Sequence, residues 1–192
     1  DLSGIVDFLD FKQYCLGILF CRYISENLTN YINKGEVEAG NPDFNYADLS
    51  DEDAIVAKED LIATKGFFIL PSELFVNVRK RADKDENLNV TLHNIFTNIE
   101  NSANGTESEN DLKGLFDDID VNSNKLGGTV DKRNENLVNL LNGVGDMKLG
   151  DYQENTIDAF GDAYEFLISN YASNAGKSGG EFFTPQTVSK LL

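Results

Sequence analysis

The C-terminal end of the chain, from Gly176 onward, holds the residues whose types and spacing are best suited to chemistry. Thr184 is a good N-cap acceptor, and Pro185 fits the first position of a helix, where a missing N–H group costs nothing. The following N–H groups would face outward beside the positive end of the helix dipole, which favours an anion. Phe182 and Phe183 add an aromatic surface. These residues predict a small site for a carboxylate or phosphate on a ligand with a flat ring or a sulfonium. A glycine linker before an ordinary capped helix explains them equally well.

Other motifs along the chain predict no metal or nucleotide chemistry. The run 176–178 is similar to the end of a phosphate-binding loop, but Tyr171 stands where that loop requires a glycine. Residues 118–122 are similar to the start of a calcium loop, but Ser123 occupies the position of its turn glycine. His93 has no second histidine or cysteine near it, and we interpret it as a residue at the boundary of the core. We therefore expect no metal site.

Two groups of residues have a structural as well as a functional interpretation. Cys15 and Cys21 fall on different faces of one apolar helix, so we interpret them as small core residues in a reducing compartment. Residues 79–81 form the main basic cluster of the chain. This cluster is suited to contact DNA or a partner subunit, and the preference of basic residues for helix C-termini explains it as well.

Composition narrows the classes of function. The chain has 192 residues, of which 41% are hydrophobic, so it can bury a sizeable core and wholesale disorder is not expected. It carries 33 acidic and 16 basic residues, a formal net charge of −17. That balance argues against a broad surface for gripping DNA, because binding to the phosphate backbone relies on lysine and arginine. No apolar run is long enough to cross a membrane, so we expect no membrane association.

Helical periodicity runs through most of the chain. A long helix is predicted from Asp10 to Gly35, with apolar side chains over more than half of its circumference, and we expect it at the centre of a bundle. A second helix is predicted from Ser50 to Gly66. The four apolar residues 67–70 then predict a buried extended segment or a short strand.

The second half of the chain continues this pattern. A helix is predicted to start at Pro71, and the apolar residues between 92 and 99 have the spacing of a strongly amphipathic helix. Apolar residues from 112 to 119 predict a further short helical face. Gly127 and Gly128 lead into a helix that Gly143 is expected to stop. The glycine-rich cluster 142–146 is the best candidate for a domain boundary.

Several stretches resemble a known family. The segment from Gly179 to Pro185 looks like the one that opens the methyltransferase domain in the modification subunits of type I restriction–modification systems. Other parts of the chain are similar to the same family, namely Asp10 to Tyr14, Leu19 to Glu26, Gly66 to Pro71, Leu115 to Asp120 and Tyr164 to Leu167. The resemblance implies a mainly α fold, with an N-terminal helical bundle domain over residues 1–145. It implies that residues 146–192 form the first helices of a truncated α/β Rossmann-like methyltransferase domain.

The resemblance also implies an activity and a cofactor. Members of the family are N6-adenine DNA methyltransferases that use S-adenosyl-L-methionine, and this segment contacts the methionine end of the cofactor. Glu181 would accept from the ammonium group, Phe182 or Phe183 would pack on the cofactor, and Thr184 would help to meet the carboxylate. The implied cofactor-binding residues are therefore Glu181, Phe182, Phe183, Thr184, Pro185 and Gln186.

The catalytic motif of the family is not found in this sequence. That motif is an Asn or Asp followed by two prolines and an aromatic residue, whereas Pro42, Pro71 and Pro185 are the only prolines here and none is adjacent to another. We assign no catalytic residue to the chain. We expect it to be the front part of an enzyme and to be inactive alone.

Partners and location follow from the same resemblance. It implies a DNA specificity subunit, a restriction and translocase subunit, a second modification subunit, and double-stranded DNA bound through the full complex. It also implies the cytoplasm of a bacterium or archaeon. The alternative is a self-contained acidic helical adaptor for protein–protein interaction. The glycine- and aromatic-rich segment near the C-terminus favours the enzyme, because an adaptor does not need one.

Overall fold

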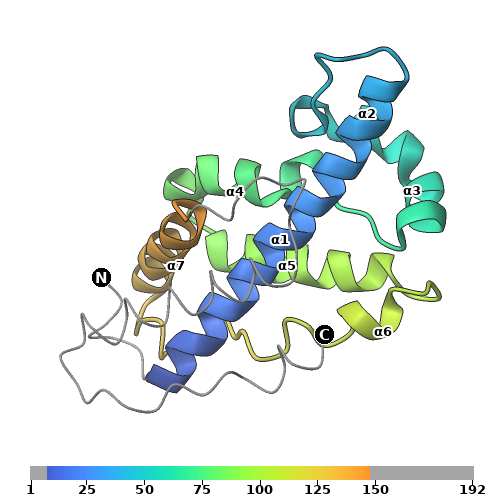
Figure 1. The fold of residues 1–192 in the computed structure, drawn as a ribbon. Helices are drawn as coiled ribbons and strands as arrows, with labels where there is room; N and C mark the ends of the chain where they lie inside the picture. Colours follow the sequence, from blue (N-terminus) through green and yellow to red (C-terminus); the bar gives the residue numbers. More distant parts are fainter. Residues whose placement is uncertain (1–7, 148–192) are drawn as a thin grey trace.

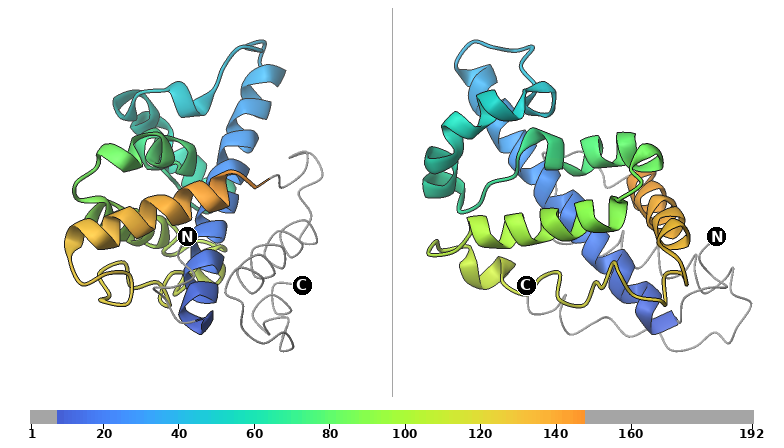
Figure 2. Two further views of the ribbon diagram at one scale, coloured as in Figure 1. Left: turned by 90° about the vertical axis from the view of Figure 1, so that its left-hand side faces the viewer. Right: turned by 180° about the vertical axis from the view of Figure 1, so that it is seen from behind.

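The computed structural model describes residues 8–147, and one long helix organises this part of the chain. Helix α1, Phe8–Glu38, crosses the molecule from end to end (Figure 1). Helices α4, Phe75–Arg81, and α7, Val130–Gly145, pack directly on it. Helix α5, Leu88–Ser102, packs on α7, and the four helices surround a common core (Figure 2).

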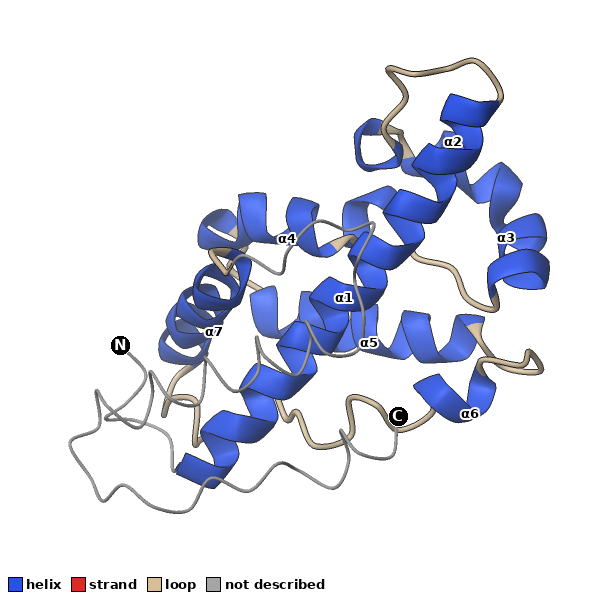
Figure 3. Cartoon of the chain, viewed as in Figure 1, coloured by secondary structure: helices blue, strands red, loops and turns tan. Residues whose placement is uncertain are grey.

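All regular elements between residues 8 and 147 are helical (Figure 3). The shorter ones are η1 (Tyr46–Asp48), α2 (Asp51–Ala54), η2 (Ile55–Ala57), α3 (Lys58–Lys65), η3 (Pro71–Glu73), η4 (Ala82–Lys84) and α6 (Glu109–Leu112). The predicted mainly α fold is therefore confirmed. The predicted start of a Rossmann-like domain lies outside the described residues and stays a prediction. None of the described helices is long and apolar enough to span a membrane.

The core confirms the central position predicted for the first helix. Cys15, Ile18, Leu19 and Leu28 are completely buried along α1. Gly17 faces the loop after α6, where an added Cβ atom would lie 1.6 Å from Cδ1 of Ile119. Only a glycine leaves room for this contact, which brings the loop onto the helix.

The bounds predicted for the first helix are wrong at both ends. The helix begins at Phe8, so Asp10 lies inside it rather than at its cap. It also continues through Gly35 to Glu38, because one glycine costs a helix only about 1 kcal/mol. The chain leaves the helix at Gly40, whose φ of 97° suits glycine. The N–H group of Asn41 then donates to the Glu36 carbonyl over 2.9 Å and closes the helix end.

Two further expectations for helices are wrong. Residues 113–118 form turns instead of a helix, because Gly114 adopts a φ of 74° directly after α6. Leu112, Phe116 and Ile119 are still buried, so the apolar spacing identified the contacts but not the backbone. Gly143 does not stop the last described helix, which continues to Gly145.

The region between residues 50 and 74 follows the predictions more closely. The Ser50 side chain caps the start of α2 by accepting the N–H group of Asp53, and Gly66 ends α3 with a φ of 91°. A 3₁₀ turn interrupts the single helix that was predicted there. Residues 67–70 are extended, as predicted, and Ile69 is completely buried. The helix predicted from Pro71 exists in two parts, η3 and α4, separated by an extended Leu74.

Candidate functional site

The predicted cofactor contacts, Glu181 to Gln186, lie outside the described residues, and so does most of the segment 146–192. The structure does describe the end of the helical domain that leads toward them. This end is the predicted boundary 142–146, at the C-terminus of α7. Two arginines from different helices converge on it, and we call the resulting set of contacts the arginine clamp.

Arg22 forms the inner half of the clamp. It lies in the middle of α1 and is only 6% exposed. Its Nη1 atom donates to the Val144 carbonyl over 2.7 Å and to the Met147 carbonyl over 2.8 Å. Its Nε atom donates to Oε1 of Glu26, one turn along α1, over 2.8 Å. One side chain thus binds carbonyl groups at and beyond the end of α7, where helical partners are missing.

Arg79 forms the outer half of the clamp from the last turn of α4. Its Nε atom donates to Oδ1 of Asn142 over 3.1 Å, and its Nη2 atom pairs with the Asp146 carboxylate. Gly145 lies directly against it, because an added Cβ atom there would be 2.4 Å from Nη1 of Arg79. A second positive charge at this helix end also interacts favourably with the negative pole of the α7 dipole.

The clamp ties the predicted domain boundary to the rigid core. Helix α7 is anchored by the completely buried Leu137 and Val144, and the two guanidinium groups hold the residues that follow. The direction in which the chain leaves the described domain at Met147 is therefore set by α1 and α4. The basic cluster 79–81 is accounted for in part, since Arg79 acts within the fold, whereas Lys80 is exposed.

Sequence reasoning missed Arg22. The helical periodicity of the segment gave it no role. The available signal was an arginine directly after the apolar run 14–21, because charged side chains are rarely buried without a partner. That signal predicts a buried pair, and Glu26 stands at the i, i+4 position.

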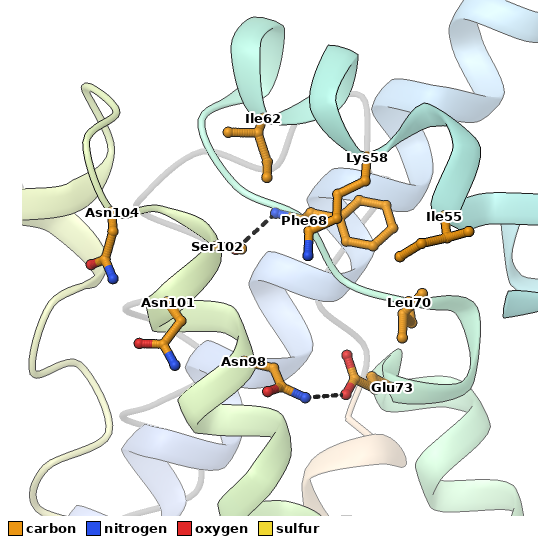
Figure 4. Close-up of a pocket in the computed structure, with 10 residues that line it drawn as sticks. All are labelled: Ile55, Lys58, Ile62, Phe68, Leu70, Glu73, Asn98, Asn101, Ser102 and Asn104. Carbon is orange, nitrogen blue, oxygen red and sulfur yellow. Dashed lines mark hydrogen bonds between the residues drawn. The ribbon is translucent and has the colours of Figure 1, made fainter. Parts of the chain in front are cut away.

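A polar groove of about 420 Å³ lies between α3, the extended segment 67–70 and α5 (Figure 4). Asn98 donates to Oε1 of Glu73 across the groove over 2.6 Å. The Nζ atom of Lys58 lies 5.9 Å from the centre of the Phe68 ring. Ser102 accepts the Phe68 N–H group over 3.0 Å and donates to a carbonyl of its own helix.

The groove is suited to binding rather than to catalysis. The Ser102 hydroxyl already holds the extended segment in place, and the Lys58 ammonium lies over the Phe68 ring. Asn101 and Asn104 present exposed amide groups that can donate and accept hydrogen bonds (Figure 4). In the described part of the chain, no group of three metal-ligating side chains comes together.

The cysteines and the histidine have no role in such a site. Cys15 and Cys21 are free and buried, which agrees with their interpretation as core residues. Burial raises the pKa of the Cys21 thiol to about 12 and moves the pKa of Cys15 in the same direction, so both thiols are protonated and unreactive. His93 is exposed on α5, so its predicted position at the boundary of the core is wrong.

Two family models match the chain in sequence order. Residues 1–144 match the HsdM N-terminal domain, and residues 155–192 match the N-6 DNA Methylase family. The type I restriction enzyme MpnII methylase subunit of Mycoplasma pneumoniae is 53% identical over 100% of this chain and 36% of its own length. The type I restriction enzyme MjaIX methylase subunit of Methanocaldococcus jannaschii is 26% identical over 95% of this chain and 31% of its own length.

A solved structure is also similar. It is the crystal structure of the type I restriction-modification system methyltransferase subunit from Streptococcus thermophilus, with 28% identity and a TM-score of 0.67. The match covers 99% of this chain and 40% of that one. The chain thus spans between 31% and 40% of the length of these relatives.

Proposed function

The chain belongs to the family of the HsdM N-terminal domain, as part of a type I restriction–modification methylase subunit, and from this premise we propose that its full-length protein is an adenine-specific DNA methyltransferase. The observation that carries the proposal is the order of the two family matches. The match to the HsdM N-terminal domain over residues 1–144 is followed, after ten residues, by a match of residues 155–192 to the N-6 DNA Methylase family. We place the boundary between the domains after residue 145, at the arginine clamp.

In this proposal, residues 181–186 bind S-adenosyl-L-methionine. When bound, the cofactor supplies the methyl group that is transferred to the N6 atom of adenine. Thr184 caps the helix whose first N–H groups meet the carboxylate, Glu181 accepts from the ammonium group, and Phe182 or Phe183 packs on the cofactor. The described residues include none of this site, so the assignment rests on the residue types and on the family resemblance.

The helical domain contributes position rather than reacting groups. By holding residues 142–147, the arginine clamp sets the direction in which the chain enters the methyltransferase domain. The net charge of −17 indicates that most phosphate contacts come from other parts of the complex. We propose that these parts include a specificity subunit, a second modification subunit and, for cleavage, a restriction and translocase subunit. The complex would act in the cytoplasm of a bacterium or archaeon.

The alternative of a self-contained acidic adaptor is less well supported. An adaptor has no use for the start of a methyltransferase domain, whereas residues 155–192 match one. We expect the full-length protein, combined with its specificity subunit, to transfer a labelled methyl group from S-adenosyl-L-methionine to DNA. The chain of 192 residues should transfer none. Labelled DNA with the short chain alone, or none with the full complex on DNA that carries its site, would contradict the proposal.

A further inference from the structure

The region from η2 to α3 exposes apolar side chains that the rest of the described domain would bury. Neither element contains a buried residue. Val56 is 83% exposed and Ile55 46% exposed, while the apolar residues of α5 facing the core are buried. Tyr31 and Val37, near the end of α1, are also exposed. These four residues are most of the exposed large hydrophobic side chains in the described part of the chain.

A groove of about 600 Å³ separates α3 from the C-terminal part of α1. Its apolar lining includes Ile32 from α1, Phe44 and Leu49 from the loop that follows, and Leu61 from α3. All four are only partly buried. Helices α2 and α3 lie at the end of α1 away from α7, so this groove is far from the arginine clamp (Figures 1 and 2).

Four acidic residues and one basic residue, Lys34, line the edge of the groove, so its edge is negative on balance. Glu36 and Glu38 border it on the α1 side, and Asp53 and Asp60 border it on the side of α2 and α3. Residues 36–60 contain nine acidic residues and one lysine. Within the described residues, none of the four bordering carboxylates forms an ion pair. Four carboxylates against one lysine leave a net negative edge around an apolar floor.

We propose that this acidic groove binds an amphipathic helix of a partner protein, one with an apolar face flanked by lysine and arginine. A helix of this kind would bury its apolar face on Leu61 and Phe44 and place its basic residues against the four carboxylates. Charge complementarity selects this occupant, because it compensates the excess of negative charge and orients the helix in the groove.

The same charges disfavour the other occupants. The phosphates of DNA would be repelled by the acidic edge. A second copy of this chain would bring a net charge of −17 against it. The chain's own residues 148–192 carry six acidic and three basic residues, so they also lack the complementary charge. The groove is thus suited to a basic protein segment, independently of methyl transfer.

A designed peptide tests the proposal with the chain of 192 residues. The probe is a helical peptide about 18 residues long, with leucine at i, i+3, i+4 and i+7 spacing and lysine or arginine at the other positions. We expect saturable binding in calorimetry that weakens as salt is raised. The same peptide with glutamate in place of the basic residues should not bind. No saturable binding of the basic peptide, or equal binding of both peptides, would overturn the proposal.

Matched variants locate the binding. Glu38→Lys combined with Asp60→Lys should weaken the binding of the basic peptide by about tenfold or more. The control combines Glu107→Lys with Asp118→Lys, which makes the same change of net charge at exposed positions outside the groove. It should weaken binding by less than about threefold. An equal loss of peptide affinity in the two double variants would show only a general attraction to an acidic protein and would overturn the proposal.

A second pair of variants separates the apolar contribution from the charges. Tyr31→Ser removes an exposed aromatic side chain at the groove, and Val90→Ser removes a similarly exposed apolar side chain on α5. Both proteins should remain folded, because neither side chain is buried. Only Tyr31→Ser should weaken the binding of the basic peptide. If sedimentation instead shows that Tyr31→Ser dissociates a dimer of the chain, the groove is a self-association surface and the proposal is wrong.

Discussion

Replacing Arg22 with methionine should destabilise the helical domain strongly. The substitution keeps an apolar stem of similar length and removes the hydrogen bonds to Val144, Met147 and Glu26. It also leaves the Glu26 carboxylate partly buried, with its side chain 21% exposed and Oε2 already without a partner. Both side chains of the pair are shielded from water, so the attraction between them is weakly screened.

The expected loss is about 3 to 5 kcal/mol in the free energy of unfolding, the typical effect of removing one partner from a buried ion pair. A domain of this size has a stability of about 5 to 15 kcal/mol, so the effect is large enough to measure in urea. Adding Glu26→Met should recover part of the loss, because the unpaired charge disappears. Lysine at position 22 should give an intermediate result, since it keeps the charge but not the planar set of donors.

The control is an exposed ion pair on the same fold. Lys132 and Glu135 lie one turn apart on α7, with side chains 43% and 59% exposed. Lys132→Met should therefore cost less than about 1 kcal/mol. Unfolding followed by far-ultraviolet circular dichroism gives both values. If Arg22→Met costs no more than Lys132→Met, the clamp does not hold the end of α7 and the reasoning is refuted.

Three other outcomes are expected. Gly17→Ala should lower the free energy of unfolding by about 1 to 3 kcal/mol, because the new Cβ atom would overlap Ile119. Gly35→Ala should raise it by about 0.4 to 1 kcal/mol, because no atom lies within 4 Å of the position of the new Cβ atom. Urea unfolding of both proteins checks the two values. The stability should fall as the pH rises from about 9 toward 12, because burial raises the pKa of Cys21 from 9.0 to about 12 and the thiol ionises there mainly in the unfolded chain. Burial moves the pKa of Cys15 and Tyr46 in the same direction, so the decline measured by unfolding should be smaller in Cys21→Ala, and an equal decline in both proteins would contradict the role of Cys21. In the full-length enzyme, Thr184→Ala should weaken the binding of S-adenosyl-L-methionine, measured by calorimetry, more than it weakens the binding of DNA. A larger loss of DNA binding would make this segment a docking element.

Local patterns predicted much of the fold because local physics decides those elements. The caps at Ser50 and Gly66 and the buried segment 67–70 depend on a few neighbouring residues, and the structure has all three. The predicted helix over 112–119 failed because the same apolar spacing can be produced by turns once Gly114 takes a positive φ. Periodicity reports which side chains are buried and does not fix the backbone between them.

Long-range contacts were not predictable in the same way. Arg22 donates hydrogen bonds to the carbonyl groups of residues 144 and 147, which lie more than a hundred residues away in the sequence. No local sequence pattern gives the position of such acceptors. The exposed face of α3 was also unexpected, because the sequence shows that Leu61 and Ile62 are apolar but not whether another helix covers them. The candidate cofactor residues 181–186 were identified from residue types and family resemblance, and they stay a prediction.

The identity of the methylated base tests the central claim most directly. DNA carrying the recognition site is incubated with S-adenosyl-L-methionine, the full-length subunit and its specificity subunit, then digested to nucleosides and analysed by mass spectrometry. We predict N6-methyladenine in this sample and none with the chain of 192 residues alone. Methylcytosine in place of N6-methyladenine, or N6-methyladenine formed by the short chain alone, would contradict the account.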